Sequence, residues 1–156
     1  MTTHVHESPS IPALFATIEV MVSVYRVEEP EPLHKRGNTA SGLYIVLFDK
    51  DVVHVQDSGI ATRIVYRLSA DTVESGIVFS GAFASDPRFQ LSGPYLDCST
   101  PHPGSADEPQ PYDLLSYMHT NTHASLISLS LQFSDLRKGG RRVAYDPQIT
   151  NTPGDN

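Results

Sequence analysis

The segment from Gly93 to Pro111 carries the densest set of side chains that could do chemistry. It combines a tyrosine and several carboxylates with five prolines and two glycines, a composition that excludes a helix and indicates an irregular loop. An aromatic ring can stack on the apolar C–H face of a sugar, and a carboxylate can accept protons from sugar hydroxyls. The same composition is also typical of an exposed loop without a ligand. We predict that the ligand-binding residues are Tyr95, Asp97, His102, Tyr112, Asp113 and Asn121.

A pair of histidines, His119 and His123, is the candidate for metal binding. Four positions along a strand place both on one face but about 13 Å apart, which is too far for one metal ion. A helix would bring them together, but the intervening Thr120, Asn121 and Thr122 are poor helix formers. The spacing marks no third ligand. We therefore predict no metal and no cofactor. The alternative is a small cupin-like, metal-dependent β-sandwich enzyme that uses both histidines.

Nucleophilic catalysis would have to use Cys98, with His102 four residues further on as its base. Both residues lie in the proline-rich segment, which does not by itself hold a nucleophile and a base in a fixed geometry. No third orienting residue follows from the sequence, and the Gly-x-Ser-x-Gly, Walker and dinucleotide-binding motifs are absent from it. We predict that the protein has no catalytic residues and is not an enzyme.

The overall composition narrows the compartment and the partners. The 156 residues carry a formal net charge of -7, which argues against binding to a nucleic-acid backbone because that binding needs clustered Lys and Arg. Pro12 and Glu19 interrupt the apolar stretch at 11–24, so it predicts neither a signal peptide nor the roughly 18–20 apolar residues of a membrane helix. A single cysteine favours a reducing compartment. We expect a cytoplasmic protein without nucleic-acid or membrane partners.

Alternation of apolar residues with period two predicts the strands that would position these side chains. In 17–27 the even-numbered residues from Ile18 to Val24 are uniformly apolar, and in 125–133 the odd-numbered residues from Ile127 to Phe133 are apolar. Both sets should face a core. Further strands are predicted at 43–48, 52–55, 60–68, 72–83, 89–91 and 142–145, whereas 112–119 fits either one or two helical turns or an irregular strand.

Short strands at a spacing of roughly 8–12 residues, with turn signals between them, are typical of a sandwich or a barrel. We predict an all-β fold, an antiparallel, jelly-roll-like β-sandwich, in a single domain. The domain should span 14–150, between a flexible N-terminal segment at 1–13 and a flexible tail at 151–156. Within it, Gly139-Gly140 predicts the tip of the last hairpin, and Gly76 and Gly81 indicate a bulge or a close backbone approach.

Three parts of the sequence resemble one known family. They are IEVMVSVYRV at 18–27, GLYIVLF at 42–48 and the ending LSLQFSDLRKGGRRVAYDPQIT at 129–150. In this family a late strand leads through a polar hairpin to an aromatic-rich strand that closes on Asp-Pro-x-Ile-Thr or a similar motif. The counterparts here are Leu131-Gln132-Phe133 and Tyr145-Asp146-Pro147-Gln148-Ile149-Thr150. The order of these features over 17–150 is similar to that of the bacterial inclusion body protein family (PixA/AidA-like).

The resemblance implies a β-sandwich protein made abundantly in the bacterial cytoplasm. It also implies links to crystalline inclusions and host-associated behaviour and, for some members, glycan binding, but no catalytic residues. We therefore expect a non-enzymatic, carbohydrate-binding or self-assembling protein. Its partners would be glycans and further copies of itself, in a homodimer or a larger homo-oligomer driven by exposed strand edges.

Overall fold

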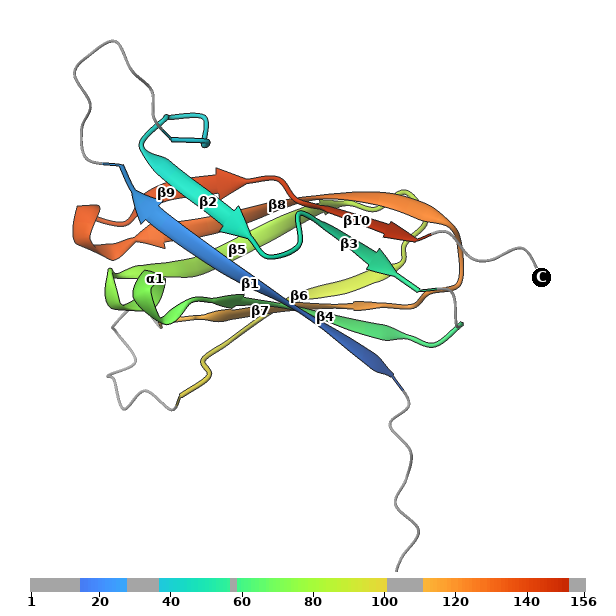
Figure 1. Ribbon diagram of the computed structural model, residues 1–156. Coiled ribbons are helices and arrows are strands. Elements are labelled where there is room, and N and C mark those ends of the chain that lie inside the picture. The colour runs from blue at the N-terminus through green and yellow to red at the C-terminus, as the bar shows by residue number, and fades with distance from the viewer. Residues whose placement is uncertain (1–14, 28–36, 57–58, 101–110, 152–156) are drawn as a thin grey trace, which may run out of the picture.

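The computed structural model describes residues 15–27, 37–56, 59–100 and 111–151. Two β-sheets pack face to face across an apolar core, which confirms the predicted all-β sandwich (Figure 1). The first sheet has the strand order β2 (Tyr44–Phe48), β1 (Ala16–Arg26), β4 (Thr62–Leu68), β7 (Leu114–His119) and β6 (Leu91–Asp97). The second sheet has the order β3 (Val52–Val55), β10 (Gln148–Asn151), β8 (Ser125–Asp135) and β5 (Ile77–Ser85), and β9 (Arg141–Tyr145) also pairs with β8.

The two sheets are mixed, which differs from the purely antiparallel arrangement that we predicted. Strand β1 runs parallel to β4, with Ile18 opposite Ile64, and β10 runs parallel to β3, with Ile149 opposite Val53. All other strand pairs are antiparallel. Apolar alternation gives the face that each residue occupies but not the direction of the neighbouring strand, so the sequence pattern could not separate the two arrangements.

The predicted core faces of the longest strands are confirmed. Val20, Val22 and Val24 of β1 are buried, and so are the odd-numbered residues of β8 from Ile127 to Phe133. Full burial of a side chain of this size contributes about 1.5–3 kcal/mol. The Phe133 ring also stacks on Phe79 of β5, with 5.3 Å between the ring centroids. The core therefore lies between the sheets, and the even-numbered residues of β8 are left on the outer face of the second sheet.

The predicted strand at 72–83 is wrong in its first part. A short helix, α1 (Ala70–Glu74), comes first, and the Ser69 side chain caps it by accepting a hydrogen bond from the Thr72 amide. Gly76 then turns the chain with a φ of 83°, a conformation that suits glycine, and β5 begins at Ile77. The bulge indicated by Gly81 is confirmed as a shift in the register of β5 against β8 between Phe79 and Gly81.

The segment predicted to be irregular at 93–111 is partly a strand, because β6 continues through it to Asp97. Its register against β7 shifts between Ser92 and Tyr95, around the cis peptide bond of Gly93-Pro94. A proline is tolerated there because β6 is an edge strand and needs no hydrogen bond from that nitrogen on its outer side. In the short strand predicted at 89–91, Phe89 and Gln90 lie outside any strand and Leu91 begins β6, whereas 112–119 contains a strand, β7, and no helix.

The predicted C-terminal hairpin is confirmed, and one further strand follows it. Strand β8 leads through the 3₁₀ turn η1 (Leu136–Lys138) and the left-handed Gly139 and Gly140 to β9. Beyond Asp146-Pro147, β10 pairs with the first part of β8 and occupies 148–151, where the prediction placed the end of the domain and the start of a tail. The predicted segment 1–13 and residues 152–156 of the predicted tail lie outside the described residues.

A buried ionic network joins the two sheets where β8 ends. Asp135 of the second sheet is completely buried. Its Oδ2 accepts hydrogen bonds from Arg26 Nε and from the Tyr44 hydroxyl, each at 2.6 Å, and both donors belong to the first sheet. Arg26 Nη2 also donates to Asp135 Oδ1 and to the carbonyl oxygen of Ser75. Burial raises the pKa of Asp135, but the hydrogen bonds from Arg26 and Tyr44 outweigh burial and hold this pKa below its usual value.

Candidate ligand-binding site

The structure separates the residues that we predicted as one ligand-binding site. Asp97 ends β6, opposite Leu114 at the start of β7, and Asp113 immediately precedes β7. Asn121 follows the other end of this strand, and six residues of β-strand span about 20 Å. One compact ligand therefore cannot contact both groups. His102 lies outside the described residues.

The carboxylates of the predicted site are engaged in local backbone structure. Asp97 Oδ1 accepts a hydrogen bond from the Cys98 amide at 2.8 Å. Asp113 Oδ1 accepts one from the Ser99 amide at 2.7 Å, and its Oδ2 accepts one from the Ser99 hydroxyl. These contacts hold the two chain segments together on either side of 101–110. Both carboxylates thus already have donors in the protein.

The remaining predicted side chains have different surroundings. Tyr112 packs partly buried against the core, and its carbonyl oxygen accepts a hydrogen bond from the Phe79 amide. Tyr95 lies on β6 opposite Ser116 and is 56% exposed, so its ring is free to contact a ligand. Asn121 is buried with a φ of 56°, and its Nδ2 donates to the carbonyl oxygens of Gln56 and Ile60. The Asn121 side chain therefore fixes the packing of neighbouring loops.

The two candidate metal ligands have different environments. His119 is completely buried, and its Nδ1 accepts a hydrogen bond from the Asn121 amide at 2.9 Å. Burial lowers the pKa of His119, so the ring is neutral at pH 7 and carries its proton on Nε2. His123 is exposed and lies 3.0 Å from the Thr122 hydroxyl. Among residues 15–27, 37–56, 59–100 and 111–151, no three His, Cys, Asp or Glu side chains are grouped as metal ligands.

Cys98 does not have the electrostatics of an activated nucleophile. Partial burial and the neighbouring carboxylates of Asp113 and Asp97 raise the pKa of its thiol. A raised pKa lowers the fraction of thiolate, which is the reactive form. This environment is the opposite of the electropositive one that reactive cysteines have.

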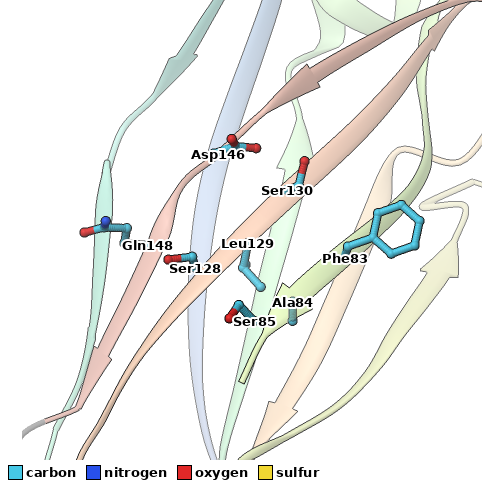
Figure 2. A pocket seen from close by; sticks show the side chains of 8 residues that line it. All are labelled: Phe83, Ala84, Ser85, Ser128, Leu129, Ser130, Asp146 and Gln148. Atoms are coloured by element: carbon cyan, nitrogen blue, oxygen red, sulfur yellow. The ribbon is translucent and has the colours of Figure 1, made fainter. Parts of the chain in front are cut away.

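A different candidate site lies on the outer face of the second sheet, where a shallow pocket encloses about 460 Å³. Figure 2 shows its lining, with the Phe83 ring of β5 on one side, the side chains of Asp146 and Gln148 on the other, and Ser128 and Ser130 of β8 between them. Register pairing brings these side chains together, since Phe83 is opposite Ser130, and both Ser85 and Gln148 are opposite Ser128.

The alternation of β8 explains why the pocket forms at this place. Its apolar odd-numbered residues point into the core, so Ser128 and Ser130 point outward. Serine is small, and a row of serines leaves a hollow between the larger flanking side chains. Phe83 is 69% exposed, although burial of a ring this size is favourable. The pocket thus presents an open aromatic face beside a hydroxylated floor.

The chemistry of this pocket suits a ligand that carries many hydroxyl groups. Each serine hydroxyl can donate and accept a hydrogen bond, the Gln148 amide can do both, and the Asp146 carboxylate accepts only. The Phe83 ring can stack on an apolar C–H surface. This is the combination of groups that we predicted from the sequence, but it occurs at other residues.

Sequence reasoning missed this site although part of its signal was visible. The outward-facing set of 125–133 contains two serines where charged residues would be usual, and Phe83 ends a predicted strand. Their relation to Asp146 and Gln148 depends on β10, which we did not predict, and on the register of β5 against β8. The pattern of a single strand does not contain that register.

Comparison with known proteins gives a distant structural likeness. No protein-family model and no curated protein matches the chain. The crystal structure of a cysteine protease inhibitor from Entamoeba histolytica is similar over 65% of this chain and 84% of that chain, with a TM-score of 0.35 and 12% sequence identity. A likeness this weak carries no argument about function. In the part of the chain that the structure describes, no helix is long and apolar enough to cross a membrane. Fold and site together define an all-β sandwich domain with a polar and aromatic pocket on one outer face.

Proposed function

We propose that this domain is a non-enzymatic binding protein whose ligand is a carbohydrate, held in the pocket on the outer face of the second sheet. One observation carries the proposal: the Phe83 ring, 69% exposed, faces the solvent beside the hydroxyls of Ser128 and Ser130 and the Asp146 carboxylate. A pyranose ring has one apolar face and a rim of hydroxyls. The phenyl ring would stack on the apolar face, and the polar side chains would bond the rim.

A shallow pocket of this kind binds weakly at a single site. Each neutral hydrogen bond contributes about 0.5–1.5 kcal/mol net, and an aromatic contact contributes about 0.5–1.5 kcal/mol beyond its buried area. The loss of translational freedom on binding offsets much of this. Strong attachment to a glycan surface would therefore come from several copies acting together, which raises avidity without new contacts.

Self-association, which the resemblance to the inclusion body protein family implies, is part of the same proposal. Strands β5 and β6 are edges of their sheets, and each presents an exposed aromatic ring, Phe83 and Tyr95 respectively. A homo-oligomer built through such edges would place several carbohydrate pockets on one particle. A bacterial cytoplasmic location for these particles remains a prediction from the sequence.

A glycan array followed by calorimetry on the best ligand tests the proposal. Replacing Phe83 with alanine should lower the affinity for that ligand about tenfold, because the stacking surface is lost. Asp146→Asn should lower the affinity by a smaller factor, since the amide can still accept one hydrogen bond. Tyr95→Ala is the matched control, because it removes another ring that is more than half exposed, from the other sheet.

The control also separates the two candidate sites. If Tyr95→Ala weakens binding and Phe83→Ala does not, the ligand binds at β6, where the sequence placed it. If the purified oligomer binds no glycan on the array, the carbohydrate proposal is wrong. Native mass spectrometry of the same samples measures the oligomeric state, and a strictly monomeric protein at high concentration would contradict the self-association.

A further inference from the structure

A second pocket of about 420 Å³ opens at the side of the sandwich, between strands β5 and β6. These strands are the edges of different sheets, and Figure 1 shows them adjacent to each other. Residues of the two strands and of the turn between them line the pocket, and Tyr117 of β7 reaches it from the core side. The lining includes the side chains of Phe83, Asp86, Phe89, Leu91, Pro94 and Tyr117.

Two polar atoms beside this pocket are buried and have no hydrogen-bond partner among the described residues. One is the Tyr117 hydroxyl, on a side chain that is 2% exposed. The other is Oδ1 of Asp86, whose Oδ2 accepts a hydrogen bond from the Leu91 amide at 2.7 Å. Nε2 of His119, which interacts electrostatically with Asp86, is unpaired as well. Buried polar groups in proteins are almost always hydrogen-bonded. The single N–H of the neutral His119 ring cannot serve every one of these groups, which leaves room for a partner from outside the protein.

The aromatic side chains at the pocket are unusually placed for a protein surface. Phe89 is 90% exposed and Phe83 is 69% exposed, so neither ring gains much from burial in the folded chain. Phe89 also adopts a φ of 52°, which is uncommon for any residue other than glycine and especially for a bulky one. Folding alone does not favour a bulky exposed ring at such a position. Contact with a ligand would account for it.

Charge selects the kind of ligand. Asp86 Oδ1 can only accept hydrogen bonds when it is ionised. The faces of Phe83 and Phe89 attract positive charge, and the protein has a formal net charge of -7. Burial raises the pKa of Tyr117 to about 12, so its hydroxyl is neutral at pH 7 and its oxygen can accept a further hydrogen bond. The nearby His119 is neutral because burial lowers its pKa.

We propose that this pocket binds a small organic cation, the protonated form of a primary alkylamine. Its ammonium group donates hydrogen bonds to Asp86 Oδ1 and to the Tyr117 oxygen. Its carbon chain lies against Phe83, Phe89 and Pro94. The site and the ligand class differ from those of the carbohydrate pocket, although Phe83 borders both.

Titration of the full chain with hexylamine, hexan-1-ol and hexanoate at pH 7 tests this proposal. The three probes share a hexyl chain and differ in head-group charge. Two-dimensional NMR follows the Leu91 amide, which reports on Asp86 because it donates to that carboxylate. Hexylamine should bind about tenfold more tightly than hexan-1-ol, since a hydrogen bond to a charged group is stronger than a neutral one. Hexanoate should not bind, because Asp86 repels it.

Two variants show which groups do the binding. Asp86→Asn keeps an acceptor for the Leu91 amide and should reduce hexylamine affinity about tenfold, to that of hexan-1-ol. Asp49→Asn is the matched control, because Asp49 Oδ1 accepts from the Met21 amide outside this pocket and its loss changes the net charge equally. Phe89→Asn removes the ring but keeps a residue that tolerates positive φ, so it should weaken hexylamine and hexan-1-ol alike without unfolding the protein.

Three results would overturn the proposal. Equal affinity for hexylamine and hexan-1-ol would show that the pocket binds carbon chains without regard to charge. Equal losses in Asp86→Asn and Asp49→Asn would show attraction to the whole acidic surface. No saturable shift of the Leu91 amide with any probe would leave buried water as the partner of the two polar atoms. An unchanged affinity for hexylamine in Asp146→Asn would show that the carbohydrate pocket is not involved.

Discussion

Replacing Arg26 with methionine tests whether the ionic network around Asp135 holds the two sheets together. Methionine keeps an unbranched apolar side chain but removes the donors to Asp135 and to the Ser75 carbonyl. The fully buried carboxylate then keeps hydrogen bonds from Tyr44 and from the Arg137 amide but has lost its cation. Removing one partner of a buried ion pair costs about 3–5 kcal/mol. At roughly 2–4 °C per kcal/mol for a domain near this size, Tm should fall by about 6–20 °C.

A matched control is available on the same sheet. Arg67 pairs with Glu19 at 2.5 Å, but both side chains are more than a third exposed, at 35% and 49%. Arg67→Met should therefore cost only about 0–1 kcal/mol. Urea denaturation followed by circular dichroism at pH 7 measures both free energies of unfolding, and scanning calorimetry measures both Tm values. Equal losses in the two variants would refute the argument that burial makes the Arg26 pair different.

The same network gives stability a defined dependence on pH. Burial pushes the pKa of Asp135 up, but the hydrogen bonds from Arg26 and Tyr44 prevail, so the folded-state pKa lies below the unfolded-state value of about 3.9. The stabilisation from Asp135 is fully present above the unfolded-state pKa and is lost as pH falls through the folded-state pKa. Asp135→Asn should therefore be less stable than the wild type at pH 7, with a difference that narrows in acid. A difference that stays constant down to about pH 2 would contradict this linkage.

Three further variants test local features of the fold. Gly93→Ala should lower the free energy of unfolding by about 1–3 kcal/mol, because Gly93 has a φ of 122° and an added Cβ would lie 3.0 Å from the Ser116 carbonyl oxygen; urea titration with an unchanged m-value would verify the effect. His119→Ala should cost about 2–3 kcal/mol, because it empties a buried position and leaves the Asn121 amide without its acceptor. His123→Ala, at an exposed position, should change stability by less than about 0.5 kcal/mol. Equal effects of the two histidine variants would show that burial of His119 is not what matters.

The parts of the fold that depend on local burial could be predicted from the sequence. The alternation in β1 and β8 marks the core face because each strand buries one side against the opposite sheet. The helix α1 escaped prediction because five residues are too few to show a helical period, although Ser69 and Thr72 supply a capping signal. The strand β6 was not predicted because Gly93-Pro94 is typical of a loop. A proline fits a strand only at the edge of a sheet, and the sequence does not show that β6 is an edge strand.

The sequence indicated the kinds of side chain that line the candidate sites, but not the residues that supply them. The sequence indicated aromatic rings beside carboxylates, and the structure has this combination at Phe83 with Asp146 and at Phe89 with Asp86. In both pockets the ring and the carboxylate come from different strands or turns. They become neighbours only through the register of the strands and their order in the sheets. In and beside the segment 93–111, which the sequence marked as the binding loop, Asp97 and Asp113 instead accept hydrogen bonds from nearby backbone amides.

The position of β10 has a consequence for how the chain is made. This strand lies between β3 and β8, so β3, from the first half of the sequence, has its strand partner in residues 148–151. During synthesis from the N-terminus, Val53 and Val55 must wait for nearly all of the described chain before they gain a pairing strand. A ribosome-bound intermediate would therefore expose an unpaired valine-rich edge, and such edges aggregate. The interval before residue 151 emerges is therefore when the chain most needs a chaperone.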